Sequence, residues 1–180
     1  MQVAVYGGSF DPPHVGHAMV AGWLLWTGRV DRVLLVPAFA HAFDKRSAPF
    51  EGRLALCRAM AADVDAARVV VVDIEAHLPT PSYTLHTLRA LAAEHPDLRL
   101  RLVVGADVLE QTDHWHAWST IQDEFAPIVV GRVGWPPVPG APSFPGVSST
   151  EIRQRSAAGQ PVDHLVTAGV AALLASGGTL

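Results

Sequence analysis

Short apolar runs alternate with longer stretches of helical periodicity along most of the chain. Short runs of β-branched and aliphatic residues are typical of buried strands, and they cover residues 3–6, 32–36, 69–72, 98–104 and 127–130. The longer stretches predict helices over residues 15–27, 50–62, 82–94 and 162–175, with a further helix that begins near Ser148. Because residues 69–72 are all valine, we expect that strand to be covered on both faces.

Strands and helices that alternate at this spacing predict a Rossmann-like α/β fold, a doubly wound parallel sheet with helices on both faces. The 180 residues suit a single domain. Residues 134–146 hold five prolines and three glycines, so we expect an irregular loop at about 133–146, followed by a helical segment over about 149–176. Ligands of such sheets bind beside the carboxyl ends of the strands, which directs attention to the loops after Tyr6, Val36 and Val104.

Composition narrows the classes of function. The formal net charge is −4, from 13 basic and 17 acidic residues, which argues against binding to a nucleic-acid polymer. The single cysteine, Cys57, lies in an apolar helical run, so we expect a buried core residue and no oxidising compartment. No apolar stretch reaches the roughly 18 residues of a membrane span, and the first residues lack the features of a signal peptide. We therefore expect a cytoplasmic protein without membrane contact.

The loop between the first predicted strand and the first predicted helix carries the main candidate chemistry. Residues 7–17, called the signature loop below, are Gly-Gly-Ser-Phe-Asp-Pro-Pro-His-Val-Gly-His. Its two leading glycines let a ligand approach the backbone closely, and a helix N-terminus favours anions. His14 and His17 are three positions apart at the helix start, so both imidazoles face the same way and are able to donate hydrogen bonds to phosphate oxygens.

Other phosphate-binding motifs do not match the signature loop. It lacks the Gly-x-Gly-x-x-Gly pattern of dinucleotide-binding proteins and the Gly-Lys-Ser/Thr of a P-loop. A zinc site lacks a third nearby ligand at the usual spacing, and either histidine alone is as easily structural as functional. Far downstream, Ser148 and Glu151 have the spacing of a helix capping box.

The signature loop resembles the defining loop of the nucleotidyltransferases that carry a His-x-Gly-His motif. A second segment, Val-Ser-Ser-Thr-Glu-Ile-Arg at residues 147–153, resembles the Ser-Ser-Thr-x-Ile-Arg motif of the same family. The resemblance runs from residue 3 to about residue 155. Within the family, the bacterial nicotinate-nucleotide adenylyltransferases are the most similar, through the segments Pro81-Ser82-Tyr83-Thr84, Thr87-Leu88, Gly105-Ala106-Asp107 and Trp115-x-x-Trp118.

This resemblance implies the transfer of AMP from ATP to nicotinate mononucleotide, giving nicotinate adenine dinucleotide and pyrophosphate in NAD biosynthesis. It implies three catalytic residues, with His17 at the α-phosphate, His14 on the ATP phosphates and Arg153 on the departing pyrophosphate. Mg²⁺ is expected on the ATP phosphates, held mostly by water and substrate and not by a protein metal site. The expected ATP contacts are Gly7, Gly8, Ser9, Phe10, His14, His17, Gly105, Asp107, Ser148, Ser149, Thr150 and Arg153.

The acceptor is less firmly indicated than ATP. The resemblance implies that Lys45, Thr84, Trp115 and His116 bind the pyridine nucleotide, with Trp115 stacked on the ring. However, the family commonly has Pro-Pro-His-Lys in the second loop, whereas residues 39–45 here are Phe-Ala-His-Ala-Phe-Asp-Lys. Nicotinamide mononucleotide is therefore an alternative acceptor.

Three further questions stay open at the level of sequence. CTP is an alternative to ATP, because the base would be read near Asp107 and Arg132, whose letters do not reveal the base. A catalytically weak paralogue that only binds nucleotides is a second alternative. The apolar C-terminal helix is consistent with a homodimer and equally with packing on the sheet.

Overall fold

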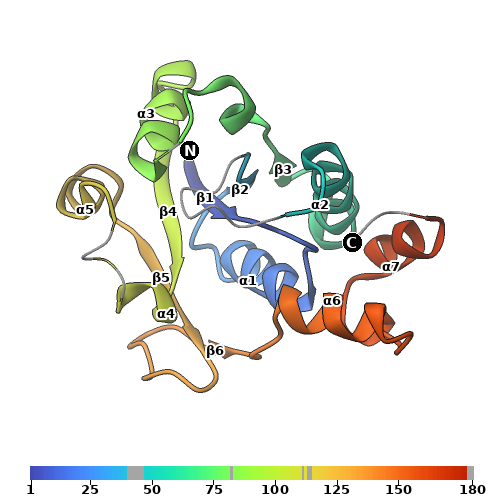
Figure 1. Cartoon of the computed structure of the whole chain (residues 1–180). Coiled ribbons are helices and arrows are strands. Elements are labelled where there is room, and N and C mark those ends of the chain that lie inside the picture. The colour runs from blue at the N-terminus through green and yellow to red at the C-terminus, as the bar shows by residue number, and fades with distance from the viewer. Residues whose placement is uncertain (40–46, 82, 111, 113–114, 178–180) are drawn as a thin grey trace.

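A parallel sheet lies at the centre of the molecule (Figure 1). The computed structural model describes residues 1–39, 47–81, 83–110, 112 and 115–177. Within these residues the strands are β1 (Gln2–Gly8), β2 (Arg32–Pro37), β3 (Val69–Val71), β4 (Arg99–Gly105), β5 (Ile128–Arg132) and β6 (Ser143–Phe144). Their order is β3-β2-β1-β4-β5-β6, and all neighbours pair in parallel. The prediction of a doubly wound parallel sheet is confirmed.

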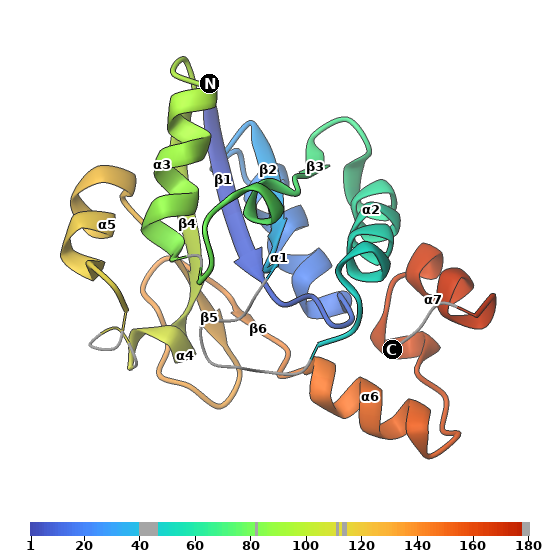
Figure 2. The same ribbon diagram turned by 45° about the horizontal axis from the view of Figure 1, so that its top comes forward.

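Helices cover both faces of this sheet (Figure 2). One face carries α1 (Val15–Trp26), α2 (Phe50–Asp65), α6 (Ser149–Ala157) and α7 (Ala168–Ala175), while the other carries α3 (Thr84–Glu94) and α5 (Trp118–Phe125). Among the described residues, the shorter helical pieces are η1 (Ile74–His77), α4 (Ala106–Leu109) and η3 (Asp163–Leu165). Among the described residues no helix is long and apolar enough to cross a membrane.

The central strand β1 shows why its sequence is apolar at successive positions. Ala4 is fully buried in the core beneath α1 and α2, whereas Val3 and Val5 are buried in the core beneath α3 and α5. Successive side chains of a strand point to opposite faces, so a strand covered on both faces needs an uninterrupted apolar run. Cys57 lies in the first of these cores, as expected, and burial raises the pKa of its thiol to about 12.

The edges of the sheet differ from the sequence prediction. The valine run was expected to be covered on both faces, but β3 is an edge strand and Val70 is 37% exposed. At the other edge, the segment expected to be wholly irregular forms β6, which pairs with β5 through Gly131 and Ser143. Phe144 is buried there against Trp23, so apolar burial outweighs the surrounding prolines.

Helix boundaries also shifted in several places. The last helix begins at Ala168 and not at residue 162, because Val166 and Thr167 are extended and the Asp63 carboxylate accepts a hydrogen bond from the Gly169 amide. It packs mainly on α2, not on the sheet. Ser82, expected to cap α3, lies outside the described residues, and Tyr83 occupies the N-cap position. The short helices α4 and α5 were not predicted.

The sheet order creates a crevice at the carboxyl ends of β1 and β4. From β1 the chain crosses to β2 on one side, and from β4 it crosses to β5 on the other. The two loops therefore leave in opposite directions, which opens a binding crevice at this switch point. β1 ends at Gly7 and Gly8, and β4 ends at Gly105.

Candidate active site

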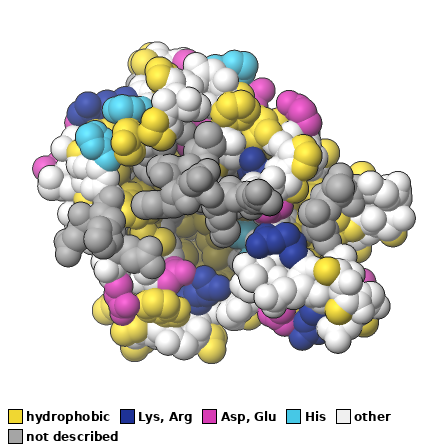
Figure 3. Space-filling model, in the orientation of Figure 1, with side chains coloured by type: hydrophobic (Ala, Val, Ile, Leu, Met, Phe, Trp, Pro, Cys, Tyr) yellow, Lys and Arg dark blue, Asp and Glu magenta, His cyan; other side chains and the backbone are white. Residues whose placement is uncertain are grey.

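A cavity of about 820 Å³ opens at this switch point. Its size is in the range of small-molecule sites. It is lined by the ends of β1, β2, β4 and β5, the start of α1 and α3, and residues 145 and 147 ahead of α6. In the space-filling view the hollow has hydrophobic side chains at its floor and Lys or Arg side chains near its rim (Figure 3).

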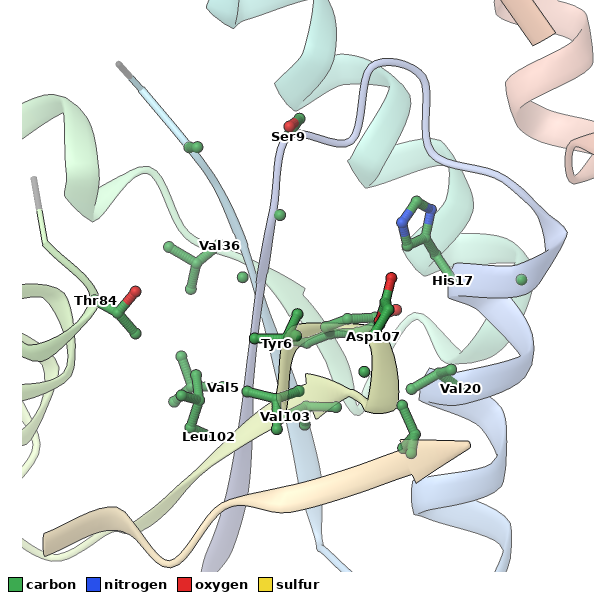
Figure 4. A pocket seen from close by; sticks show the side chains of 18 of the residues that line it. Val5, Tyr6, Ser9, His17, Val20, Val36, Thr84, Leu102, Val103 and Asp107 are labelled. Carbon is green, nitrogen blue, oxygen red and sulfur yellow. The ribbon is translucent and has the colours of Figure 1, made fainter. Parts of the chain in front are cut away.

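The cavity extends to both sides of β1. Figure 4 shows Thr84 on one side of the carboxyl end of β1, and His17 with Asp107 on the other. Val5 and Leu102 line the wall toward Thr84, on the face packed by α3. A cavity that spans the switch point in this way has room for two ligands that meet over the end of β1.

The signature loop is held down by aromatic packing at its base. Phe10 has a left-handed backbone with φ of 46° and a side chain that is 1% exposed. Its ring packs edge-on against Tyr6 at 5.7 Å and against His17 at 4.8 Å between centroids. Left-handed non-glycine residues persist only where surrounding contacts fix them, so this buried ring sets the path of the loop. Burial raises the pKa of the Tyr6 phenol, and the Asp107 charge adds to that shift.

His14 and His17 form a stacked pair at the start of α1. Their ring centroids are 3.7 Å apart with planes inclined by 24°. The His14 backbone N–H donates to His17 Nδ1 at 3.2 Å, so the proton of the neutral His17 ring is on Nε2. His14 is 8% exposed, and its Nδ1 has no hydrogen-bond partner among the described residues. The prediction that both imidazoles face the same way is confirmed.

Both imidazoles are neutral at physiological pH. Burial, followed by the charge of Arg132, lowers the pKa of His14 to about 4. Burial, His14 and Arg132 in that order lower the pKa of His17 well below its usual value. A neutral imidazole with its proton on Nε2 donates a hydrogen bond without supplying charge. The first turn of α1 contains no acidic residue, so its N-terminal dipole is available to an anion.

Arg132 at the end of β5 pairs with Asp107 at the start of α4. Arg132 Nη1 lies 2.7 Å from Asp107 Oδ2, and Nη2 lies 3.5 Å from the carbonyl oxygen of Val147. A Cβ on Gly105 would collide with the Asp107 carboxylate, so a side chain at position 105 would displace the pair. From the sequence, Arg132 was expected only to lie near the base of the nucleotide. In the structure its two contacts also connect β5 to α4 and to the segment before α6.

The N-terminus of α6 docks on the signature loop. Ser148 Oγ accepts a hydrogen bond from the Glu151 amide at 3.1 Å, which confirms the predicted cap, and Ser149 Oγ donates to the Pro12 carbonyl at 2.9 Å. Arg153 donates to the carbonyl oxygen of Asp11 and pairs with its carboxylate at 3.4 Å. The two segments singled out in the sequence are therefore in direct contact.

The far half of the cavity is lined by Thr84, Trp115 and His116, which the resemblance assigned to the pyridine nucleotide. Trp115 packs edge-on against Trp118 at 5.5 Å between centroids, and the His116 ring lies 4.7 Å from that of Tyr83. Glu75 also lines this half. Its carboxylate accepts hydrogen bonds from the Thr87 hydroxyl at 3.1 Å and the Phe39 amide at 3.1 Å. Sequence reasoning gave Glu75 no role, because a single acid in a short connection between predicted elements has no distinctive pattern.

The predicted site residues divide into three groups. Lys45 lies outside the described residues. Phe10, Ser148, Ser149, Thr150 and Arg153 do not line the cavity, although Phe10 lies beneath the signature loop and the other four lie at the helix docked on it. The residues that do line the cavity are Gly7, Gly8, Ser9, His14, His17, Thr84, Gly105, Asp107, Trp115 and His116.

The described residues contain no group of three or more His, Cys, Asp or Glu that could hold a metal ion. The Asp107 carboxylate lines the cavity and is the kind of hard oxygen donor that Mg²⁺ accepts. Its pairing with Arg132 already offsets its charge. Glu75, the other carboxylate among the described residues that line the cavity, already accepts hydrogen bonds from Thr87 and Phe39. A bound Mg²⁺ would therefore depend mainly on phosphate oxygens and water.

Comparisons with known proteins agree with this geometry. A family model described as cytidylyltransferase-like matches residues 5–155. A "Probable nicotinate-nucleotide adenylyltransferase" of Anaeromyxobacter dehalogenans (strain 2CP-C) is 50% identical over 166 residues, covering 92% of this chain and 89% of the relative. Another of that name, from Myxococcus xanthus (strain DK1622), is 39% identical over 169 residues, covering 93% and 88%.

Solved structures share the fold. The Plasmodium falciparum nicotinic acid mononucleotide adenylyltransferase complexed with NaAD has a TM-score of 0.82 at 18% identity, covering 97% of this chain and 95% of that chain. The site and the matches thus define a nucleotidyltransferase. The chain belongs to the cytidylyltransferase-like family and, within it, to the nicotinate-nucleotide adenylyltransferases.

Proposed function

We propose that this protein joins the AMP part of ATP to nicotinate mononucleotide, giving nicotinate adenine dinucleotide and pyrophosphate. The observation that carries this proposal is the stacked pair of His14 and His17 at the N-terminus of α1, which faces a cavity that spans the switch point. The choice of acceptor is supported by the relatives named above. The setting is cytoplasmic, in keeping with the lone buried thiol of Cys57.

The reaction needs positioning and charge stabilisation more than proton transfer. An oxygen of the acceptor's 5′-phosphate attacks the α-phosphorus of ATP. A new P–O bond forms as the bond to the β-phosphate oxygen breaks, and its electron pair leaves with pyrophosphate. Because both reactants are anions, the site must align them in line and offset their charge. A cavity lined by two imidazoles, the N-terminus of α1 and Arg132, with Arg153 beside it, suits this task.

His17 donates its Nε2–H to an oxygen of the α-phosphate, where charge builds up. Its Nδ1 is already occupied by the His14 amide, so the donor is aimed before the substrate arrives. His14 stacks against His17 and contacts the remaining phosphates. Both rings stay neutral because their pKa values are lowered, so neither acts by giving up a proton.

Arg153 and the N-terminus of α6 hold the pyrophosphate end. Arginine suits this role because its planar fork pairs with phosphate oxygens. Mg²⁺, when bound, would neutralise part of the phosphate charge. It would be held by substrate oxygens and water, and Asp107 would be the protein carboxylate that contacts it. Asp107 and Arg132 otherwise fix the wall of the adenosine side.

Thr84, Trp115 and His116 receive the pyridine ring on the other side of β1. Trp115 supplies a flat apolar face for stacking, and Lys45 is proposed to reach the acceptor phosphate from the second loop.

A homodimer is a separate proposal, whose test is the mass of the protein in solution.

The deciding experiment is pyrophosphate release by the purified protein. Mg²⁺-ATP is supplied in parallel with nicotinate mononucleotide, nicotinamide mononucleotide or phosphopantetheine, and CTP replaces ATP in a second series. We expect strong preference for ATP with nicotinate mononucleotide. Preference for another pair would move the protein to a sister activity. Tight ATP binding without any release would indicate a nucleotide-binding paralogue.

A further inference from the structure

Two buried charged residues connect the signature loop to the elements around it. Asp11 is 3% exposed and Arg53, in the first turn of α2, is 2% exposed. Neither lines the cavity. Burial of a guanidinium group or a carboxylate is costly unless the group is paired and hydrogen-bonded, so the partners of these two side chains show what they hold in place.

Arg53 bridges two segments that are far apart in the chain. Its Nη1 donates to the carbonyl oxygen of Ser9 at 2.8 Å, and its Nε donates to the carbonyl oxygen of Ala48 at 3.0 Å. Ser9 belongs to the signature loop and lines the cavity, while Ala48 lies between residue 47 and the start of α2. The planar guanidinium fixes the angle between its donors, so one side chain sets the relative position of both backbones.

Asp11 continues this connection to α6. Its carboxylate accepts a hydrogen bond from the Ala48 amide, at 3.3 and 3.4 Å from its two oxygens. The same carboxylate pairs with Arg153 at 3.4 Å, and Arg153 also donates to the Asp11 carbonyl. Ala48 is therefore held through its carbonyl by Arg53 and through its amide by Asp11. The contacts form one continuous path from Ser9 to Arg153.

The charges along this path favour the same arrangement. Two guanidinium groups, those of Arg53 and Arg153, flank the carboxylate of Asp11, and the charge of Glu75 also acts on Arg53. The Asp11 charge also opposes the burial effect that lowers the pKa of Arg53. Arg153 is thus oriented by a carboxylate whose own position depends on the segment that Arg53 holds.

We propose that Arg53 is a positioning residue for adenylyl transfer, which orients Arg153 through Ala48 and Asp11 and fixes the cavity-lining backbone at Ser9. This inference rests on the proposed role of Arg153 in binding the phosphates of ATP. Displacements of about 1 Å in a positioned group are enough to cost a hundredfold in rate. Loss of the Arg53 guanidinium should therefore impair ATP binding and turnover, although Arg53 itself does not line the cavity.

The test is a double-mutant cycle measured by ATP binding. Arg53→Lys keeps the charge but loses the fork, and it is combined with Arg153→Met. Calorimetry with Mg²⁺-ATP and no acceptor gives the dissociation constant of each variant. We expect Arg53→Lys to weaken binding about tenfold in the wild-type background and only about threefold in the Arg153→Met background, where its effect on the backbone at Ser9 remains but its effect on Arg153 does not. An equal loss in both backgrounds, or no loss in either, would overturn the proposal.

Two controls separate positioning from general damage. Arg29→Met removes an arginine that also binds a backbone carbonyl, that of Gly140 at 2.6 Å, and covers the Trp23 ring. It should leave ATP binding unchanged. Asp11→Asn should remove most of the coupling, because it breaks the charged link between the two arginines. If Arg53→Lys lowers the unfolding temperature, a second cycle combines Asp11→Asn with Arg153→Met. Additive effects of these two substitutions on the dissociation constant of Mg²⁺-ATP would overturn the proposal.

Turnover distinguishes this proposal from the proposed function. Arg53→Lys should lower kcat while the KM for nicotinate mononucleotide stays within about twofold, because Arg53 donates hydrogen bonds to Ser9 and Ala48, and the lysine keeps the charge that acts on Glu75. If the cycle shows coupling between Arg53 and Arg153 in ATP binding but the wild-type protein transfers no adenylyl group, only the proposed function is contradicted. Normal transfer with additive effects in the cycle would contradict the positioning role alone.

Discussion

His14 and His17 stack with ring centroids 3.7 Å apart, and the backbone N–H of His14 donates to Nδ1 of His17. The hydrogen bond fixes which nitrogen of His17 carries the proton, and the stacking restricts rotation of both rings. The edge-on ring of Phe10 packs on His17 at 4.8 Å. The donor that faces the cavity is therefore set by the fold before any ligand binds, which is what preorganised charge stabilisation requires.

His17→Ala should lower kcat by about 10²–10³, the usual loss for one preorganised donor. His17→Gln retains an N–H on a side chain of similar length and should recover part of that rate. Pyrophosphate release under saturating Mg²⁺-ATP and acceptor measures both. Thermal unfolding of both variants checks that the loss is chemical. Near-normal turnover of His17→Ala would remove this residue from the mechanism.

Acid should destabilise the protein through the buried histidines. The pKa of His14 is about 4 in the folded state against 6.5 without burial, so below pH 6.5 the unfolded chain binds a proton that the folded chain does not. Stability is therefore complete above pH 6.5 and is lost as the pH falls toward 4. This residue alone should cost about 2 kcal/mol between pH 7.5 and pH 5, and His17 adds to it.

Urea denaturation at pH 7.5 and pH 5 measures that loss. His14→Gln should show a smaller difference between the two values, because glutamine does not titrate. His95→Gln, which changes an exposed histidine, is the matched control and should leave the difference unchanged. If the wild type and His14→Gln lose the same stability between pH 7.5 and pH 5, His14 is not the source of that loss.

Arg132→Met should raise the pKa of both histidines. The positive charge of Arg132 contributes to the lowered pKa of His14 and of His17, in each case behind burial. Its removal should recover only part of the shift, since burial is the larger cause. Titration of the imidazole resonances by NMR gives the values. Arg101→Met, which removes an arginine bound to the Ala126 carbonyl on an exposed surface, should leave both unchanged.

Gly16→Ala should impair catalysis, because an added Cβ would lie 3.1 Å from Nδ1 and Cε1 of His14. The stacked pair would have to shift by a few tenths of an ångström, so we expect a loss in kcat with little loss of helix. Gly52→Ala in α2 meets nothing within 4 Å and should stabilise the protein by roughly 0.5–1 kcal/mol with unchanged turnover. Equal turnover of the two variants would show that the histidine pair tolerates displacement.

Trp115→Ala should raise the KM for nicotinate mononucleotide, because loss of a stacking face commonly costs about 1–3 kcal/mol. The KM for ATP should change little, since Trp115 lines the cavity and packs on the core beneath α3, the helix that carries Thr84. Trp118 packs against Trp115 but does not line the cavity, so Trp118→Phe is the control. Similar effects on both substrates would show that Trp115 acts through the fold.

Local patterns in the sequence were enough to predict the elements whose structure depends on residues close together in the chain. The apolar run of β1 and the glycines that end it depend on neighbours within a few residues, and the first strand and helix follow from them. Ser148 caps α6 because a capping interaction spans only three positions. The facing of His14 and His17 follows in the same way from helix geometry. The family, too, was visible in two short motifs.

The edges of the sheet and the boundaries of some helices were not predicted, because they depend on contacts with elements that are distant in the sequence. The valines of β3 suit a fully covered strand, but only the strand order places them at an edge. The short strand β6 exists because Phe144 finds an apolar neighbour in Trp23, more than a hundred positions earlier in the chain. The start of α7 depends on the Asp63 carboxylate of another helix.

The sequence by itself determined the parallel α/β architecture, the histidine pair and the family, since each resides in a contiguous segment. Only the tertiary structure decided how Arg153 is oriented, because its partner Asp11 is 142 positions away. The pairing of Arg132 with Asp107 and the bridge made by Arg53 likewise depend on which strand ends become neighbours. Hydrogen bonds and ion pairs require atoms to meet within a few ångströms, and the order of strands in the sheet, not spacing along the chain, brings these side chains together.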